Sequence, residues 1–205
     1  MSDEQELEKL AKQIEVCTRC ELHLSRKRAV PGEGPTHAEI MFIGEGPGAR
    51  ENEQGRPFVG ASGKFLDQLL EQAGVTRADV WITNVVKCRP PGNRDPFPDE
   101  VETCTSNYLQ HQINIVNPSI IVTLGRFSMS MFFKGAKITQ IHGQMRKVAD
   151  HFVIAMYHPA AALHQISLKP VIMEDFARLP DLLKEARTEL EKSGSKGKAP
   201  KKRSK

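Results

Sequence analysis

Short apolar runs alternate with helical patterns along this chain, and this alternation constrains the fold more than any other feature. Four runs have the length and composition of buried strands, at residues 39–43, 79–86, 119–124 and 152–157. Apolar residues recur at helical spacing between and around them, at residues 3–16, 61–73, 101–116, 126–133 and 175–190. We therefore predict an α/β protein, a three-layer α/β/α sandwich with a central four-stranded, largely parallel sheet.

The C-terminal segment differs in composition from the rest of the chain. Residues 192–205 contain seven Lys or Arg and no acid, among Ser, Gly, Ala and Pro. Subtracting those seven from the 29 basic residues leaves 22 against 25 acids, a net charge of −3. We predict one domain over residues 1–191 and a disordered basic tail over 192–205. Such a tail attracts nucleic acid or a protein partner, or serves only solubility.

The beginning of the chain and its hydropathy indicate a cytoplasmic protein. The first five residues, Met-Ser-Asp-Glu-Gln, are polar and acidic and do not resemble a signal peptide. No apolar run approaches the ~18 residues that a membrane-spanning helix requires. We therefore expect a location in the cytoplasm and no contact with a membrane.

The chain has four cysteines, and their spacing suggests a metal or cluster site. Cys17 and Cys20 form a C-x-x-C pair, whereas Cys88 and Cys104 bracket a proline-rich loop in mid-chain. In a reducing compartment, such a set favours metal ligation over disulfides. Two structural disulfides or four unlinked buried thiols remain alternatives, and spacing alone does not separate an iron–sulfur cluster from zinc.

Glycine-rich and polar residues follow each predicted strand. They are Gly44-Glu-Gly-Pro-Gly48, the segment from Asn84 to Cys88, Gly125-Arg126 and His158-Pro159. Ligands of parallel α/β sheets bind beyond the carboxyl ends of the strands. We therefore predict that these residues converge on one functional site.

Each candidate site residue has a functional and a purely structural interpretation. Glu45 can handle a water molecule, or it can be an exposed acid in a tight turn. Phe58 can be an aromatic platform for a base or a core anchor of its loop. Asn84 can read a donor and an acceptor on one ligand edge, or cap its strand. His158 can act at the site or be a satisfied core histidine.

The glycine run also matches the dinucleotide-binding pattern G-x-G-x-x-A, with Asp67 at about the distance of the ribose-binding acid. That pattern requires a helix that opens inside the glycine run. Residues 50–57 are polar and interrupted by Gly and Pro, so we predict a loop there and no dinucleotide site.

Taken together, these motifs resemble the family 4, iron–sulfur uracil-DNA glycosylases over about residues 7–185. The motifs are Gly44-Glu-Gly-Pro-Gly48, Gly55-Arg-Pro-Phe-Val-Gly60, Asn84-Val-Val-Lys-Cys-Arg-Pro-Pro91, Pro98-Asp-Glu100 before Cys104, and His158-Pro-Ala160. They occur in order, with all four cysteines placed as in the family. The resemblance implies a DNA repair enzyme of base excision repair, which hydrolyses the N-glycosidic bond of uracil and leaves an abasic site.

The resemblance also implies a cofactor and a binding site. Cys17, Cys20, Cys88 and Cys104 would hold a [4Fe–4S] cluster. Uracil flipped out of single- or double-stranded DNA would lie against the backbone of Gly44, Glu45 and Gly46, stack on Phe58, and bond to Asn84 and His158. Glu45 and His158 match the catalytic positions of the family, and we expect the enzyme to be a monomer.

Two other classes of protein remain alternatives. One is a non-catalytic nucleic-acid-binding module with structural zinc, and the other is a redox protein that uses a cluster for electron transfer. If the tail does not contact DNA, the basic residues to test are those of the predicted site loops, Arg56, Lys87, Arg89 and Arg94.

Overall fold

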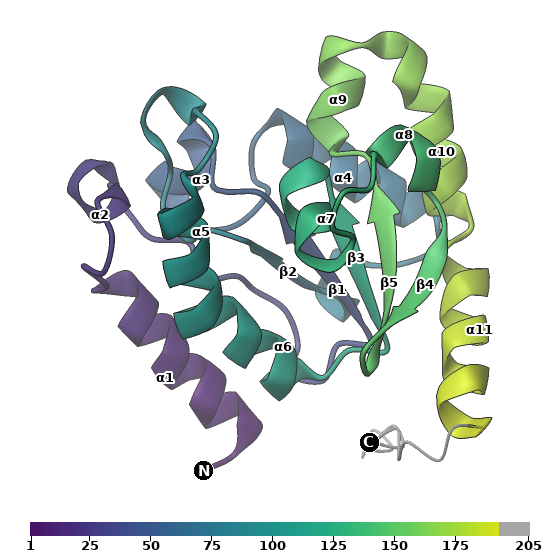
Figure 1. Cartoon of the computed structure of the whole chain (residues 1–205), viewed down its shortest axis with the longest axis horizontal. Helices are drawn as coiled ribbons and strands as arrows, with labels where there is room; N and C mark the ends of the chain where they lie inside the picture. Colours follow the sequence, from purple (N-terminus) through teal and green to yellow (C-terminus); the bar gives the residue numbers. More distant parts are fainter. Residues whose placement is uncertain (193–205) are drawn as a thin grey trace.

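The computed structural model describes residues 1–192, which fold around one five-stranded sheet (Figure 1). The strand order is β2-β1-β3-β5-β4. The strands are β1 (Ile40–Gly44), β2 (Trp81–Asn84), β3 (Ile120–Leu124), β4 (Met145–Val148) and β5 (His151–Met156). Strands β2, β1, β3 and β5 run parallel, whereas β4 is antiparallel to β5.

Helices cover both faces of the sheet, because alternate strand residues contribute to two separate apolar cores. The first core joins the sheet to α1 (Asp3–Glu15), α2 (Leu22–Ser25), α5 (Pro98–Cys104), α6 (Gln110–Val116), α7 (Arg126–Phe132) and α8 (Ile138–Ile141). The second joins it to α4 (Ala61–Gln72), α9 (Pro159–His164), α10 (Lys169–Ala177) and α11 (Leu179–Lys192). In Figure 1, α1 and α11 accordingly lie on opposite sides of the sheet.

The predicted α/β/α sandwich is confirmed, with one strand more than expected. The four predicted strands are the parallel ones, and β1, β2 and β3 are buried along their whole length. The fifth strand, β4, has the sequence Met-Arg-Lys-Val and is only partly buried. A polar edge strand pairs on one side only, so it carries no continuous apolar run for sequence analysis to detect.

The loop predicted for residues 50–57 is wrong, because a short helix, α3 (Ala49–Gln54), begins directly after the glycine run. Gly48 is its N-cap, and Gly55 ends it with a φ of 72°. Only Asn52 of this helix is buried, so the helix has no apolar periodicity. Asp67 lies in α4 and forms an ion pair with Arg77 at 2.9 Å, so the acid of the dinucleotide pattern is engaged within the protein.

Two further boundaries differ from the prediction. The helix expected at residues 101–116 begins at Pro98 and contains a π-helical segment, η3 (Thr105–Leu109), between α5 and α6. The helix expected at 175–190 is divided into α10 and α11. Of the predicted tail, Lys192 ends α11, and residues 193–205 lie outside the described part. Within residues 1–192, no helix is long and apolar enough to cross a membrane.

Candidate active site

Parallel pairing brings the ends of four strands together, as predicted. The register of β1 and β2 places Gly44 beside Asn84. Strand β3 ends beside β5, and the N–H of Gly125 donates to the carbonyl of Met156 at 2.9 Å. A Cβ atom on Gly125 would lie 3.1 Å from Cβ of His158. The glycine loop, Asn84 and His158 therefore lie along one edge of the sheet.

Gly44 lies where no side chain fits. A Cβ atom added there would lie 2.4 Å from Oδ1 of Asn84 and 2.8 Å from Cζ of Phe58. Two residues on, a Cβ on Gly46 would lie 2.8 Å from Cγ2 of Val86. Glycine at both positions lets the backbone approach these side chains closely.

Asn84 carries an acceptor without a partner. The residue is 2% exposed. Its Oδ1 atom has no hydrogen-bond partner among the described residues. An unsatisfied buried acceptor costs ~1–3 kcal/mol, so this atom favours a ligand that donates a hydrogen bond to it. An N–H of a planar base has the required chemistry.

Phe58 holds a strained backbone conformation. Its φ is 50°, in the left-handed region that a bulky residue rarely adopts. The ring is buried, and its centroid lies 5.6 Å from that of His158, with an angle of 30° between the planes. A Cβ on Gly63 would lie 1.8 Å from the Phe58 carbonyl oxygen, so α4 can approach this loop only through glycine.

Two charged residues hold the Phe58 loop from both sides. Oε1 of Glu51 accepts hydrogen bonds from the N–H groups of Val59 and Gly60, each at 2.8 Å. The guanidinium of Arg77 donates to the carbonyls of Pro57 and Phe58 at 2.5 and 3.2 Å. Sequence analysis did not identify Glu51 or Arg77, because their partners become neighbours only in the folded chain.

His158 is neutral and presents a donor. The residue is the N-cap of α9, and its Nδ1 accepts the N–H of Ala160 at 3.1 Å. The proton of the neutral ring therefore lies on Nε2. Burial lowers the pKa of His158 to about 4, and the nearby charge of Glu51 opposes this shift only in part. At neutral pH the ring is an uncharged hydrogen-bond donor.

Glu45 is a half-buried carboxyl on the glycine loop. Burial raises the pKa of Glu45, the charge of Asp95 raises it further, and Arg126 lowers it. Asp95 and Arg126 form an ion pair with each other. The carboxyl is thus a stronger base than an exposed glutamate, which suits a group that handles water.

All four cysteines line one small cavity. The other residues that line it are Ile14, His23, Arg26, Lys87, Thr103 and Tyr108. The four cysteines are free thiols, which does not agree with the alternative of two structural disulfides. Cys88 Sγ accepts from Arg26 Nη1 at 3.2 Å, and Cys104 Sγ accepts from the N–H of Lys87 at 3.3 Å.

The chemistry of the four thiols is compatible with the ligand set of an iron–sulfur cluster. In residues 1–192, no three metal-binding side chains converge on one ion position. In a four-iron cluster each thiolate binds a different iron, so the sulfurs surround a volume and do not meet at a point. Four thiols around one apolar cavity, with N–H donors directed at two of the sulfurs, match that requirement.

Lys87 lies in the interior, so its suggested contact with DNA is wrong. The side chain is 1% exposed, and burial lowers its pKa to about 8, against the opposing charges of Cys104 and Cys88. The other basic loop residues reach the surface. Arg56 pairs with Glu33 at 2.8 Å, and Arg94 pairs with Glu100 at 2.7 Å.

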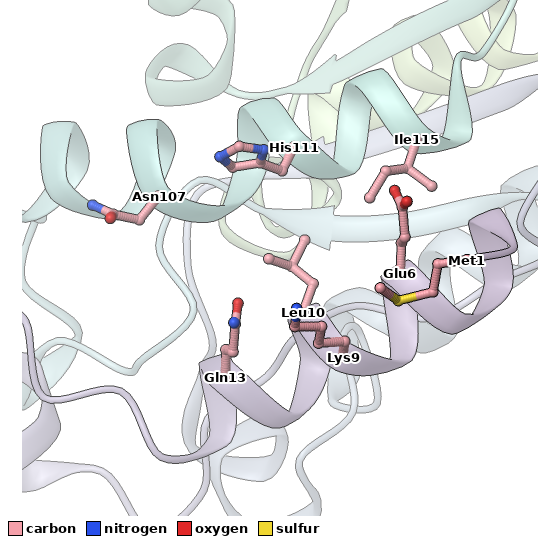
Figure 2. A pocket seen from close by; sticks show the side chains of 8 residues that line it. All are labelled: Met1, Glu6, Lys9, Leu10, Gln13, Asn107, His111 and Ile115. Carbon is pink, nitrogen blue, oxygen red and sulfur yellow. The ribbon is translucent and has the colours of Figure 1, made fainter.

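A second hollow lies away from this site. Figure 2 shows it between α1 and the helical segments η3 and α6. Its lining contains none of the predicted site residues and consists of Met1, Glu6, Lys9, Leu10, Gln13, Asn107, His111 and Ile115.

Comparison with known proteins identifies relatives along most of the chain. The family model of the uracil DNA glycosylase superfamily matches residues 31–178. A type-4 uracil-DNA glycosylase of Sulfurisphaera tokodaii is 47% identical, over 86% of this chain and 84% of the relative. Relatives of the same name from Archaeoglobus fulgidus and Thermotoga maritima are 42% and 41% identical. These two alignments cover 86% and 88% of this chain, and 92% and 96% of the relatives.

Proposed function

The chain belongs to the uracil-DNA glycosylase superfamily, and from this premise we propose how its own residues perform the reaction. Its type-4 relatives support assignment as a uracil-DNA glycosylase in DNA repair. The enzyme hydrolyses the N-glycosidic bond of uracil in DNA and leaves an abasic site. This assignment takes the place of the zinc-module and electron-transfer alternatives.

The unpaired Oδ1 of Asn84 is the observation that carries the proposed site. Uracil presents N3–H beside O4, so the Asn84 amide accepts from N3–H and donates to O4. Cytosine has no N3–H and carries a donor at position 4. It would leave Oδ1 unsatisfied and place two donors against each other, and a site built around such bonds rejects the wrong edge strongly.

Phe58 supplies the stacking surface in this proposal. Its buried ring lies against His158 and approaches the position of Gly44 closely. Uracil that lies against the Gly44–Gly46 backbone would contact this ring with its π-face. The base must first leave the DNA stack, which costs a few kcal/mol and is easiest at a mispair.

His158 stabilises the leaving group. When the C1′–N1 bond breaks, its electron pair goes to the base, which leaves as the uracil anion. The Nε2–H of a neutral His158 donates to O2, where part of this charge gathers. A pKa of about 4 supports this role, because the imidazole stays neutral at physiological pH.

Glu45 acts on the sugar side of the C1′–N1 bond. Its carboxylate stabilises positive charge at C1′ and orients a water molecule. The water oxygen bonds to C1′, its proton passes to the carboxylate and then to solvent, and the uracil anion takes a proton from solvent. The raised pKa of Glu45 supports its role as acceptor of this proton.

We assign the four cysteines to a [4Fe–4S] cluster, since type-4 enzymes are known for an iron–sulfur cluster. Cys17, Cys20, Cys88 and Cys104 would hold it. When bound, the cluster would supply structural cross-links between the N-terminal segment and the loop that follows Asn84. Arg26 supports this site, because it joins Cys88 Sγ to the carbonyls of Cys17 and Glu15.

The substrate is DNA that contains uracil, as the names of the relatives indicate. We further propose that the enzyme acts as a monomer in the cytoplasm, near the nucleoid, on single- or double-stranded DNA. Domain boundaries at residues 1–191 and 192–205 are part of the same proposal.

Release of uracil from a labelled oligonucleotide tests the activity and the site together. The wild type should release the base and leave an alkali-sensitive abasic site. Asn84→Ala and Asn84→Asp should each lose ~10²-fold or more, because two hydrogen bonds act together in the transition state. An oligonucleotide with cytosine in place of uracil serves as the substrate control. Near-normal excision by both variants would refute the role of Asn84.

A further inference from the structure

The buried ammonium group of Lys87 makes three hydrogen bonds inside the protein, and the reaction described above does not use this residue. Its Nζ atom donates to the Asn84 carbonyl, to Thr83 Oγ1 and to Gln112 Oε1, each at 2.7 Å. Thr83 Oγ1 donates in turn to the carbonyl of Pro31 at 3.0 Å, so it is free to accept from Lys87. Three acceptors require three N–H donors, which only the charged ammonium has.

These hydrogen bonds connect Lys87 to Asn84, the residue proposed to recognise uracil. Asn84 ends β2, where regular pairing with β1 stops at Gly44. Beyond it, the chain bonds to the glycine loop only through the N–H groups of Val85 and Val86. Because Oδ1 of Asn84 has no partner within residues 1–192, no hydrogen bond to that atom orients the side chain. Packing and the position of its backbone orient this buried side chain, and Lys87 Nζ binds the backbone carbonyl of Asn84.

The same residue belongs to the wall of the cysteine cavity. The N–H of Lys87 donates to Cys104 Sγ at 3.3 Å, and Cys88 follows Lys87 in the chain. The carbonyl of Lys87 accepts from the N–H of Val30 at 2.7 Å. Lys87 is thus anchored on the cysteine side through its backbone and on the Asn84 side through its side chain.

We propose that Lys87 is a positioning residue for uracil recognition, which fixes the Asn84 amide relative to the cysteine site. This inference rests on the proposed function, since it assumes that Asn84 binds uracil and that the cysteines hold the cluster. Its chemical consequence is that loss of the Lys87 side chain weakens binding of the base even though Lys87 does not touch it.

The test compares Lys87→Met with Gln112→Met. Methionine is an unbranched side chain only one atom shorter than lysine, and it donates no hydrogen bond. Both variants disturb the buried network, but Gln112→Met keeps the bond from Lys87 to Asn84. Iron content and visible absorbance report on the cluster, and equilibrium dialysis measures the affinity for free uracil. Loss of one positioning hydrogen bond predicts ~10-fold weaker uracil binding in Lys87→Met and less than ~2-fold in Gln112→Met.

A double-mutant cycle with Asn84→Ala separates this inference from the proposed function. If Lys87 acts through Asn84, adding Lys87→Met to Asn84→Ala should not lower the single-turnover rate any further. Full additivity, or equal loss of uracil affinity in Gln112→Met, overturns the inference alone. Wild-type excision by Asn84→Ala instead overturns the proposed role of Asn84.

Lys87→Gln is the second variant if Lys87→Met does not fold. It keeps a donor in the network, but an amide has two N–H groups for three acceptors, so uracil binding should weaken in the same direction. If neither variant folds while Gln112→Met does, Lys87 serves stability, and the positioning role is overturned.

Discussion

Burial acts in opposite directions on the two proposed catalytic residues. It lowers the pKa of His158 to about 4 and raises the pKa of Glu45, and both shifts favour an uncharged side chain. A neutral His158 is the form that the proposed reaction needs. Glu45 must be ionised, so the folded protein holds a desolvated charge at its site, and stability is reduced there for the sake of function.

Glu45→Gln should therefore lose activity and gain stability. The folded-state pKa of Glu45 is higher than its unfolded value, so ionisation of this carboxyl destabilises the fold as pH rises through the folded pKa. Glutamine never ionises, so the variant should melt at an equal or higher temperature than the wild type at pH 7–8. At pH 4 this advantage should be smaller. The single-turnover rate should fall ~10²-fold or more.

The pH profile of the rate gives a second measurement on the same residue. The wild-type rate should fall as the medium is acidified through the raised pKa of Glu45, and this dependence should be absent from Glu45→Gln. An unchanged acid limb in the variant would assign that titration to another group.

At the scale of elements, α3 and the loop that follows it act as one unit. Glu51 of α3 accepts from two N–H groups directly after Phe58, and Arg77 bonds to two carbonyls at and before it. Arg77 is itself paired with Glu33 and Asp67. These bonds offset the strain of the left-handed Phe58 backbone and hold its ring toward the site.

Glu51→Ala and Glu51→Gln separate this structural role from the effect of charge. Alanine leaves the N–H groups of Val59 and Gly60 without an acceptor and should destabilise the protein by ~1–3 kcal/mol. Glutamine keeps an oxygen for both bonds and should retain most of the stability and of the single-turnover rate. Melting temperatures and rates at saturating enzyme check this order. Equal losses in the two variants would show that charge matters more than the hydrogen bonds.

At the scale of the whole molecule, the cysteine cavity joins segments that are distant in sequence. Cys17 and Cys20 follow α1, Cys88 follows β2, and Cys104 ends α5. The proposed cluster would cross-link these segments on one side of the sheet, next to the loop that follows Asn84.

Cys88→Ala should accordingly lose the cluster and destabilise the fold. We expect colourless protein with little bound iron and a lower melting temperature than the wild type. Cys88→Ser provides a control with an oxygen ligand of similar size. Iron content equal to that of the wild type in Cys88→Ala would contradict the assignment of this ligand.

Removal of residues 192–205 tests the electrostatic role of the basic segment. The segment carries seven of the 29 Lys and Arg residues, whereas the remaining sequence has a net charge of −3. Each phosphate contact contributes about −0.9 to the slope of log affinity against log salt on duplex DNA. Truncation should therefore weaken binding mainly at low salt and flatten this slope. The melting temperature and the rate at saturating enzyme should change little, and an unaltered slope would exclude a contact between this segment and DNA.

The sequence by itself determined the three-layer arrangement of helices around the sheet and the chemical groups that the candidate site contains. Strands such as 119–124 were predictable because a strand buried on both faces must be apolar along its length. The convergence of Gly44, Asn84 and His158 was predictable as well, because parallel strands end at the same edge. The cysteines and glycine motifs are sufficient by themselves to indicate the family.

The tertiary structure alone decided which groups hold these residues in place. The strand β4 escaped prediction because an edge strand need not be apolar, and α3 did so because a surface helix without buried residues shows no periodicity. The buried Lys87 ammonium donates a hydrogen bond to Gln112, 25 positions away, and Arg77 meets Glu33 across 44 positions. Such partners depend on long-range packing, which local patterns do not encode, and so the support of the site became visible only in the folded chain.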